Sequence, residues 1–117
     1  MNFRTLNNLL GWIVFTAVLV VYISTLEPAA SMWDCSEFIA CAWKLQVSHA
    51  PGAPLFMMTA RLFTLLTGSN IQKVALMVNL FSAITSALTV MFLFWTITML
   101  VRNAMNKEHK TGKKDIA

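Results

Sequence analysis

Three of the five acidic residues in this 117-residue chain lie in one short segment between two long apolar stretches: Glu27, Asp34 and Glu37. Asp34 and Glu37 are three residues apart, so on a helix they share one face. A carboxylate at that place could accept a proton from an attacking hydroxyl or help to hold a divalent metal ion. The alternative is structural, because the four residues from Ser31 to Asp34 fit a capping-box pattern in which Asp34 only accepts from a backbone donor.

Two further residues are candidates for contacts to a charged substrate. His49 lies beside a Pro-Gly-Ala-Pro turn and is a candidate for catalysis or for binding phosphate, although a lone histidine is often structural. Arg61 is suited to a diphosphate, although arginine on an interfacial helix often only reaches to water. Asp34, His49, Cys35 and Cys41 offer zinc-ligand atoms, but their spacing matches no recognised pattern. We therefore assign no metal ligand from the sequence.

The composition is that of a membrane protein. Hydrophobic residues make up 57% of the chain and charged residues 12%, against roughly a quarter charged in a soluble domain. Two spans enclose too little interior to hold a substrate, so the chain is either a small membrane subunit or part of something larger. Cys35 and Cys41 are too few for a disulfide framework. Six residues apart on a helix, they face different sides, and we expect no bridge between them.

The first uncharged stretch, residues 5–26, predicts a transmembrane helix over residues 8–26. As a helix the stretch is about 33 Å long, and a hydrocarbon core is about 30 Å thick. The competing interpretation is a cleaved signal peptide. The stretch exceeds the usual apolar length of about 7 to 15 residues, and Pro28 occupies a position where cleavage after Ala30 requires a small residue.

The second uncharged stretch, residues 74–101, predicts a transmembrane helix over residues 70–101. Gly68 ends the preceding element, and Asn70 is placed to cap the new helix. Weakly polar residues recur along this helix at three- and four-residue spacing, a pattern that favours contact with neighbouring helices over contact with lipid. They are Asn79, Ser82, Thr85, Ser86 and Thr89.

The distribution of charge predicts the orientation. Residues 1–26 carry +1, residues 27–73 carry 0 and residues 102–117 carry +3, which together give the net charge of +4. By the positive-inside rule, residues 1–7 and the basic tail 102–117 are cytoplasmic, and we expect a multi-pass protein of the inner membrane. The tail is typical of a topology signal, no nucleic-acid motif accompanies it, and no nucleic-acid partner is expected.

The segment between the spans, residues 27–69, is predicted to lie outside and to contain two interfacial helices. The first is expected over residues 32–47, after Ser31, with one polar edge. That edge falls within an arc of about 80° and consists of Asp34, Glu37, Cys41, Lys44 and Ser48. Trp33 and Trp43 are predicted to anchor this helix at the membrane interface.

A turn containing two prolines and a glycine precedes the second interfacial helix, which is predicted over residues 54–67. Its apolar side chains are expected to face lipid or protein. The predicted architecture is therefore an all-α membrane protein, with two transmembrane helices joined by an external segment that carries two amphipathic helices.

Residues 25–63 also carry a set of short motifs: Glu27-Pro28, Trp33-Asp34-Cys35, Glu37-Phe38, and His49 with Pro51-Gly52-Ala53-Pro54. With these motifs the chain resembles the opening of a bacterial family of large multispanning proteins that is common in Bacteroidota. That family is related to the animal transmembrane protein O-mannosyltransferases and belongs to the GT-C class of glycosyltransferases. The resemblance covers nearly the whole chain and implies the first module of a GT-C-like multispan fold.

In the GT-C class, the first external loop carries an acidic residue that acts as catalytic base, or binds a metal in some branches, toward a sugar on a polyprenyl phosphate. The resemblance implies Asp34 as this base, Glu37 as its partner, and His49 and Arg61 as contacts to the lipid phosphate. It implies transfer to a protein hydroxyl, which is O-glycosylation, on the extracytoplasmic face. No cofactor is assigned, and a divalent metal is left open. The expected partners are membrane lipid, the lipid-linked donor and the remaining transmembrane helices of the same or a split enzyme.

Two departures from the family pattern shape this expectation. The chain has two predicted spans where the family has many, and Ser36, Ser48 and Ala50 stand where many members have glycine, glycine and proline. We therefore expect an N-terminal fragment of a membrane glycosyltransferase, a truncated gene product or one part of a split enzyme, in each case inactive alone. The alternative is a noncatalytic small membrane protein that docks a partner through its transmembrane helices.

Overall fold

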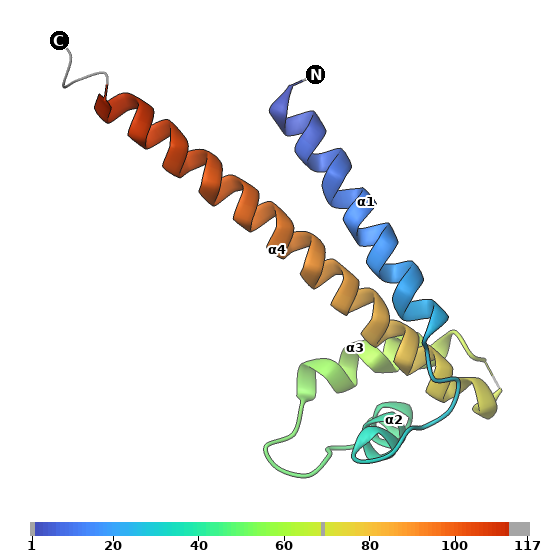
Figure 1. Ribbon diagram of the computed structural model, residues 1–117. Helices are drawn as coiled ribbons and strands as arrows, with labels where there is room; N and C mark the ends of the chain where they lie inside the picture. Colours follow the sequence, from blue (N-terminus) through green and yellow to red (C-terminus); the bar gives the residue numbers. More distant parts are fainter. Residues whose placement is uncertain (1, 69, 113–117) are drawn as a thin grey trace. The chain divides into compact units, whose positions relative to one another are not determined.

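The computed structural model of the protein describes residues 2–68 and 70–112, with side chains as far as Lys107. Within these residues the chain is helical, with no strand. The elements, in order, are α1 (Phe3–Ser24), α2 (Cys35–Lys44), α3 (Pro54–Leu65), the short 3-10 helix η1 (Ile71–Lys73) and α4 (Val74–Gly112) (Figure 1). The predicted all-α class is confirmed. The described residues form two compact units, one of residues 2–18 with 87–112 and one of Leu19–Ser86.

Two helical stretches are long and apolar enough to cross a membrane. They are Phe3–Ser24 and Ile71–Lys107, each with a mean hydropathy of 2.0 over its most apolar window. Only 11% of each window is buried within the protein, so most apolar side chains face outward. A helix that is apolar on its outer faces needs lipid or further helices to cover it. These stretches correspond to the predicted spans at residues 8–26 and 70–101.

Both long helices extend further than the sequence pattern predicted. α1 begins at Phe3, before the expected start at residue 8, and α4 continues past Val101 into the basic tail as far as Gly112. The tail continues the helix because it contains good helix formers and lacks proline before Gly112. The last residues of the predicted tail, 113–117, lie outside the described part of the chain.

In the unit of residues 2–18 and 87–112, α1 and α4 contact each other at a glycine. The indole Nε1 of Trp95 donates a hydrogen bond to the Asn7 carbonyl at 3.2 Å, and a Cβ at Gly11 would clash with the Trp95 ring. The missing side chain therefore lets the two helices approach closely, as small residues do in membrane helix pairs.

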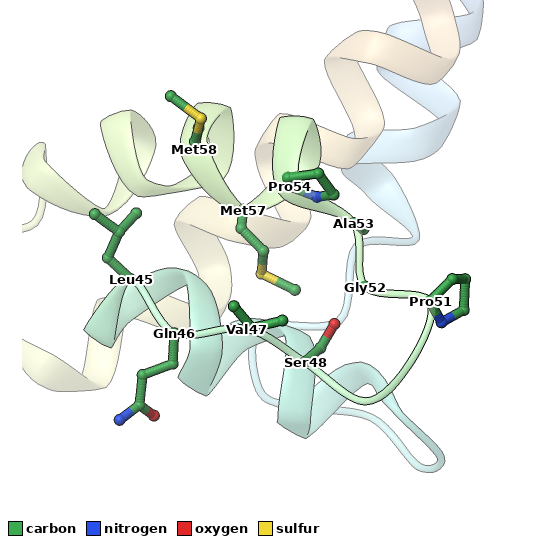
Figure 2. A pocket seen from close by; sticks show the side chains of 10 residues that line it. All are labelled: Leu45, Gln46, Val47, Ser48, Pro51, Gly52, Ala53, Pro54, Met57 and Met58. Carbon is green, nitrogen blue, oxygen red and sulfur yellow. The ribbon is translucent and has the colours of Figure 1, made fainter.

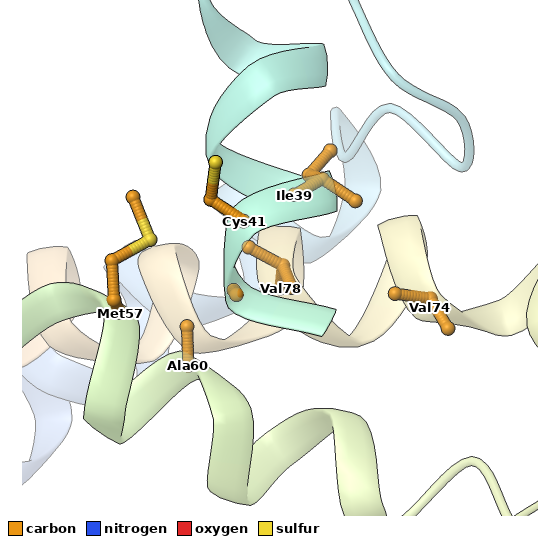
Figure 3. Close-up of a cluster of buried hydrophobic side chains, with 7 residues drawn as sticks. Ile39, Cys41, Met57, Ala60, Val74 and Val78 are labelled. Carbon is orange, nitrogen blue, oxygen red and sulfur yellow. The ribbon is translucent and has the colours of Figure 1, made fainter. Parts of the chain in front are cut away.

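In the unit Leu19–Ser86, α2 packs on α3 and on the first turns of α4. Ala42 and Ala60 are fully buried, and their small side chains allow the close approach of α2 and α3. The buried cluster consists of Ile39, Cys41, Ala42, Met57, Ala60, Val74 and Val78 (Figure 3). The ring of Phe56 packs 5.8 Å from that of Phe38 and 5.6 Å from that of Phe81. This core fixes α2, which contains Glu37 and directly follows Asp34.

α2 starts later than predicted, at Cys35, and its N-cap residue is Asp34. The Asp34 side chain makes no capping hydrogen bond, so the capping-box interpretation of Asp34 is wrong. The reason is the preceding backbone, where Trp33 has a φ of +73°. This left-handed conformation is uncommon for a bulky residue and interrupts a helix begun at Ser31.

The predicted polar edge of α2 is wrong at Cys41, which is buried against α3, and at Ser48, which is buried in the loop after α2. The predicted anchor Trp43 is half-buried in the same packing. Both cysteines are free, as predicted. α2 ends at Lys44, because Leu45 adopts a left-handed C-cap with a φ of +53°. The predicted cap at Asn70 is confirmed, since its side chain accepts a hydrogen bond from the Gln72 backbone at the start of η1.

Candidate functional site

Glu37 and His49 form the best-defined polar contact of the segment between the long helices. The His49 backbone N–H donates to Glu37 Oε1 at 2.7 Å, and the His49 ring nitrogen Nδ1 lies 2.9 Å from Glu37 Oε2. Glu37 is in the first turn of α2, whereas His49 is in the loop before α3. One carboxylate therefore holds both the backbone and the ring of His49, and it makes no contact with the other ring nitrogen, Nε2.

Asp34 lies next to this pair. Its Oδ2 is 4.0 Å from His49 Nε2, and the side chains of both residues are about half exposed. Since Asp34 makes no capping bond, its carboxylate is available to a ligand. The structure thus brings together three of the four predicted site residues, Asp34, Glu37 and His49, which we call the carboxylate–histidine cluster.

The local sequence explains how the loop presents His49. The Gly52 N–H donates to the His49 carbonyl at 2.9 Å and closes a turn in which Gly52 has a φ of +72°. Glycine reaches this conformation without steric cost. The Phe38 ring stands edge-on to the His49 ring, with centroids 6.1 Å apart. The turn and the ring contact hold the imidazole over the start of α2.

The contacts between Glu37 and His49 shift the pKa values of both side chains. The backbone N–H of His49 and then its ring lower the pKa of Glu37 below its ordinary value. The hydrogen bond and charge of Glu37 raise the pKa of His49, with a smaller contribution from Asp34. Glu37 is therefore a persistent anion, and His49 carries a proton over a wider pH range than a free histidine. The cluster can offer a carboxylate and an imidazolium side by side.

Arg61 is not part of this cluster. Its Nη1 donates to the Trp43 carbonyl and lies 3.4 Å from Thr64 Oγ1, and its guanidinium carbon is 5.1 Å from the centre of the Trp43 ring. Arg61 therefore closes the end of α2 against α3. Its predicted contact to a lipid phosphate stays a prediction, separate from the geometry of the cluster.

The carboxylate–histidine cluster has a donor set that suits a divalent cation. Asp34, Glu37 and His49 each offer one ligand atom, and these atoms lie within 4.8 Å of one another. Mixed carboxylate and imidazole donors suit ions such as Mn²⁺ or Zn²⁺. The two cysteines do not belong to this group, since Cys41 is buried and Cys35 Sγ lies 4.0 Å from Asn79 Oδ1.

Asn79 has a role that the sequence pattern did not reveal. Its Nδ2 donates to the carbonyls of Glu27 at 2.8 Å and Ala29 at 3.1 Å. We predicted Asn79 in a polar stripe for neighbouring helices, but it ties the segment after α1 to α4. The sequence contains one signal for this contact, namely that the amide side chain of Asn79 lies near the end of an apolar stretch.

Comparison with known proteins extends the resemblance found in the sequence. Residues 34–117 match the family "Protein O-mannosyl-transferase TMEM260 N-terminal domain", and this range contains all four predicted site residues. The protein O-mannosyl-transferase tmem260 of Dictyostelium discoideum is 29% identical over 91 residues, covering 78% of this chain and 11% of its own length. Protein O-mannosyl-transferase TMEM260 of Mus musculus is 37% identical over 89 residues, covering 74% of this chain and 12% of its own length.

This chain therefore spans about a tenth of the length of these relatives. No solved structure matches it. The two relatives are eukaryotic, so the predicted bacterial branch stays a prediction. The match over most of the chain shows its family: the chain belongs to the TMEM260 N-terminal domain family of protein O-mannosyl-transferases.

Proposed function

We propose that this chain is the N-terminal part of a membrane glycosyltransferase. It moves a sugar, mannose by analogy with the names of its relatives, from a polyprenyl-phosphate donor to a protein hydroxyl on the extracytoplasmic face. The observation that carries this proposal is the carboxylate–histidine cluster, assembled from two separate segments within the family match. Activity requires the further spans of a longer or split enzyme, because two helices enclose no chamber.

In this proposal Asp34 is the general base. It takes the proton of the acceptor hydroxyl while the hydroxyl oxygen forms a bond to the anomeric carbon of the sugar. The bond between that carbon and the phosphate oxygen breaks, and the polyprenyl phosphate leaves with the electron pair. A positioned base of this kind contributes roughly 10²- to 10⁴-fold to a rate. The available carboxylate of Asp34, 4.0 Å from His49 Nε2, supports this assignment.

His49 binds the phosphate of the leaving group. Because Glu37 occupies its backbone N–H and its Nδ1, Nε2 is the ring nitrogen that is left to donate to a phosphate oxygen. The raised pKa of His49 favours the charged form that binds an anion. Glu37 is accordingly a positioning residue. A bound divalent metal would be an alternative to this arrangement: the same three residues, with His49 neutral, would hold it, and it would neutralise charge on the phosphate.

The residues before Asp34 support a site at the membrane surface. Met32 and Trp33 are 91% and 90% exposed, and large apolar side chains of this kind anchor proteins in the headgroup region. Polyprenyl-phosphate headgroups lie at that depth. The orientation in the inner membrane, with both termini cytoplasmic, rests on the charge distribution.

The test is sugar transfer by the full native polypeptide in lipid nanodiscs, with radiolabelled polyprenyl-phosphate mannose and a threonine-containing peptide. Asp34→Asn should lower transfer about 100-fold or more without changing insertion. Glu27→Gln is the matched control, since it removes a carboxylate of the same segment outside the cluster and should leave transfer unchanged. Full transfer by Asp34→Asn, or no transfer by the unmodified protein, contradicts the proposal.

A further inference from the structure

A small cavity lies beside the carboxylate–histidine cluster and has no role in the mechanism above. It is a half-open hollow of about 280 Å³ between the loop after α2 and the first turns of α3 (Figure 2). Its walls are mainly apolar, and they include Leu45, Val47, Pro54, Met57 and Met58. A cavity with apolar walls and few polar groups is the usual form of a binding pocket for an apolar group.

One polar side chain lines this cavity without a partner. Ser48 is only 6% exposed, and its Oγ is buried without a hydrogen bond. Figure 2 shows this hydroxyl directed into the space between the loop and Met57. Buried polar groups are nearly always hydrogen-bonded, because an unpaired one keeps the full cost of its desolvation. The unpaired Ser48 hydroxyl therefore points to a ligand that supplies the missing bond.

The cavity is close to the residues proposed for catalysis. Ser48 directly precedes His49, and consecutive Cα atoms are about 3.8 Å apart. In an extended peptide each residue advances about 3.3 Å. The cavity and the cluster thus share one stretch of loop. An extended acceptor peptide that runs along this stretch, with its hydroxyl at the cluster, would have a side chain one or two residues away at the cavity.

We propose that the cavity binds an apolar side chain of the acceptor polypeptide, next to its reacting hydroxyl, while Ser48 Oγ donates a hydrogen bond to a backbone carbonyl of that peptide. This inference rests on the proposed function. The hydrocarbon chain of a polyprenyl donor cannot satisfy Ser48, because it has no acceptor atom. A volume of about 280 Å³ is also suited to one large side chain and not to a chain of many isoprene units.

The methionines explain how the cavity accommodates different side chains. Met57 is almost fully buried, Met58 is exposed, and both line the space. Unbranched methionine side chains adjust their shape at low cost, which suits surfaces that bind varied apolar groups. We therefore expect preference for an apolar residue beside the acceptor hydroxyl, without strict selection among leucine, isoleucine and phenylalanine.

The test is equilibrium binding to the full native polypeptide in nanodiscs, followed by fluorescence anisotropy of a labelled hexapeptide. One peptide carries a central threonine followed by leucine, and the second carries aspartate in place of leucine. The leucine peptide should bind at least tenfold more tightly. Ser48→Ala should weaken its binding about three- to tenfold, the effect of one hydrogen bond, and should not lower the thermal midpoint, because the hydroxyl has no partner in the free protein. Ser36→Ala, a matched change at an exposed serine of α2, should leave binding unchanged.

Several outcomes overturn the inference. Equal binding of both peptides, no binding of either, or an unchanged affinity in Ser48→Ala would each overturn it. Displacement of the peptide from its Ser48-dependent site by polyprenyl phosphate would also overturn it, because it would assign the cavity to the lipid. Binding that behaves as expected without any sugar transfer supports the cavity and contradicts the proposed function. Sugar transfer that is unchanged in Ser48→Ala, and that does not depend on the peptide residue beside the threonine, supports the proposed function and contradicts the role of the cavity.

Discussion

The unit Leu19–Ser86 contains two polar clusters that differ in what they leave available. In the first, Glu37 holds His49, while the side chains of Asp34 and His49 remain about half exposed. In the second, Arg61 donates to the Trp43 carbonyl, and the fully buried Thr64 hydroxyl donates to the Arg61 carbonyl at 2.7 Å. The first cluster has groups left for a ligand. In the second, which we call the Arg61 cluster, the hydrogen bonds from Arg61 Nη1 and the Thr64 hydroxyl are made within the protein.

The difference shows that residue type and position are not enough to assign a substrate contact. Arg61 and His49 both belong to the segment between the long helices, and both were predicted to meet a lipid phosphate. Arg61 stacks on the Trp43 ring and its Nη1 donates to the Trp43 carbonyl at the end of α2, an arrangement that stabilises the packing of α2 on α3. We therefore expect changes at Arg61 to alter stability and changes in the carboxylate–histidine cluster to alter chemistry.

The largest effect on folding is expected at Arg61. Arg61→Gln should reduce the free energy of unfolding of the α2–α3 region by about 2 kcal/mol, because it removes a charged hydrogen bond and a cation–π contact. Hydrogen exchange of the α2 and α3 amides measures this loss. The control Lys44→Gln changes an exposed cation at the end of α2, the helix whose last turn Arg61 contacts from α3, and should stay within about 0.5 kcal/mol. An equal loss of unfolding free energy in Arg61→Gln and Lys44→Gln would contradict the stabilising role given to the Arg61 cluster.

A smaller effect is expected when Glu37 loses its charge. Glu37→Gln should move the pKa of His49 down toward its ordinary value of 6.5, because the hydrogen bond and charge of Glu37 are what raise it. NMR titration of the His49 ring protons gives the midpoint, and Glu27→Gln should leave it in place. A His49 midpoint that is unchanged in Glu37→Gln would mean that the pair does not form.

The same pair predicts how stability depends on pH. Glu37 has a lowered pKa, so its stabilisation is complete above 4.5 and is lost as the pH falls through the lowered value. His49 has a raised pKa, so its stabilisation is complete below 6.5 and is lost as the pH rises through the raised value. The pair should therefore stabilise the fold most between pH 4.5 and 6.5. Thermal midpoints measured from well below pH 4.5 to well above pH 6.5 should be highest between these two values, and this maximum should be flattened in Glu37→Gln. A monotonic profile would count against the pair.

The smallest expected effect concerns metal binding, which should occur at the carboxylate–histidine cluster and not at the Arg61 cluster. Mn²⁺ added to the protein should broaden the ring signals of His49, since Asp34, Glu37 and His49 present their ligand atoms together. The Trp43 indole signals, beside Arg61, should stay sharp. Asp34→Asn should reduce the broadening, and equal broadening at both places would show only nonspecific binding.

The sequence was sufficient for features that depend on local pattern. The membrane composition, the two apolar stretches and the cap at Asn70 follow from hydropathy and local backbone chemistry. The candidates Asp34, Glu37 and His49 were also found from their types and from the family resemblance.

The remaining features depend on how the chain folds back on itself. The pairing of Glu37 with His49 spans twelve residues and the Asn79 contact to Glu27 spans 52, and no periodicity encodes such contacts. The capping interpretation of Asp34 failed because the left-handed backbone of Trp33 shifts the helix start. The burial of Cys41 was missed because only the packing of α3 decides which edge of α2 is covered.

The most direct test compares Asp34→Asn with Arg61→Gln in one assay, the rate of mannose transfer per folded and inserted molecule of the full native polypeptide. Asp34→Asn should lose about 100-fold or more of this rate while its folded fraction is unchanged. Arg61→Gln should reduce the folded fraction but keep the rate of each folded molecule within a few fold. The opposite result, with transfer lost in folded Arg61→Gln and retained in Asp34→Asn, would contradict the assignment of the chemistry to the carboxylate–histidine cluster.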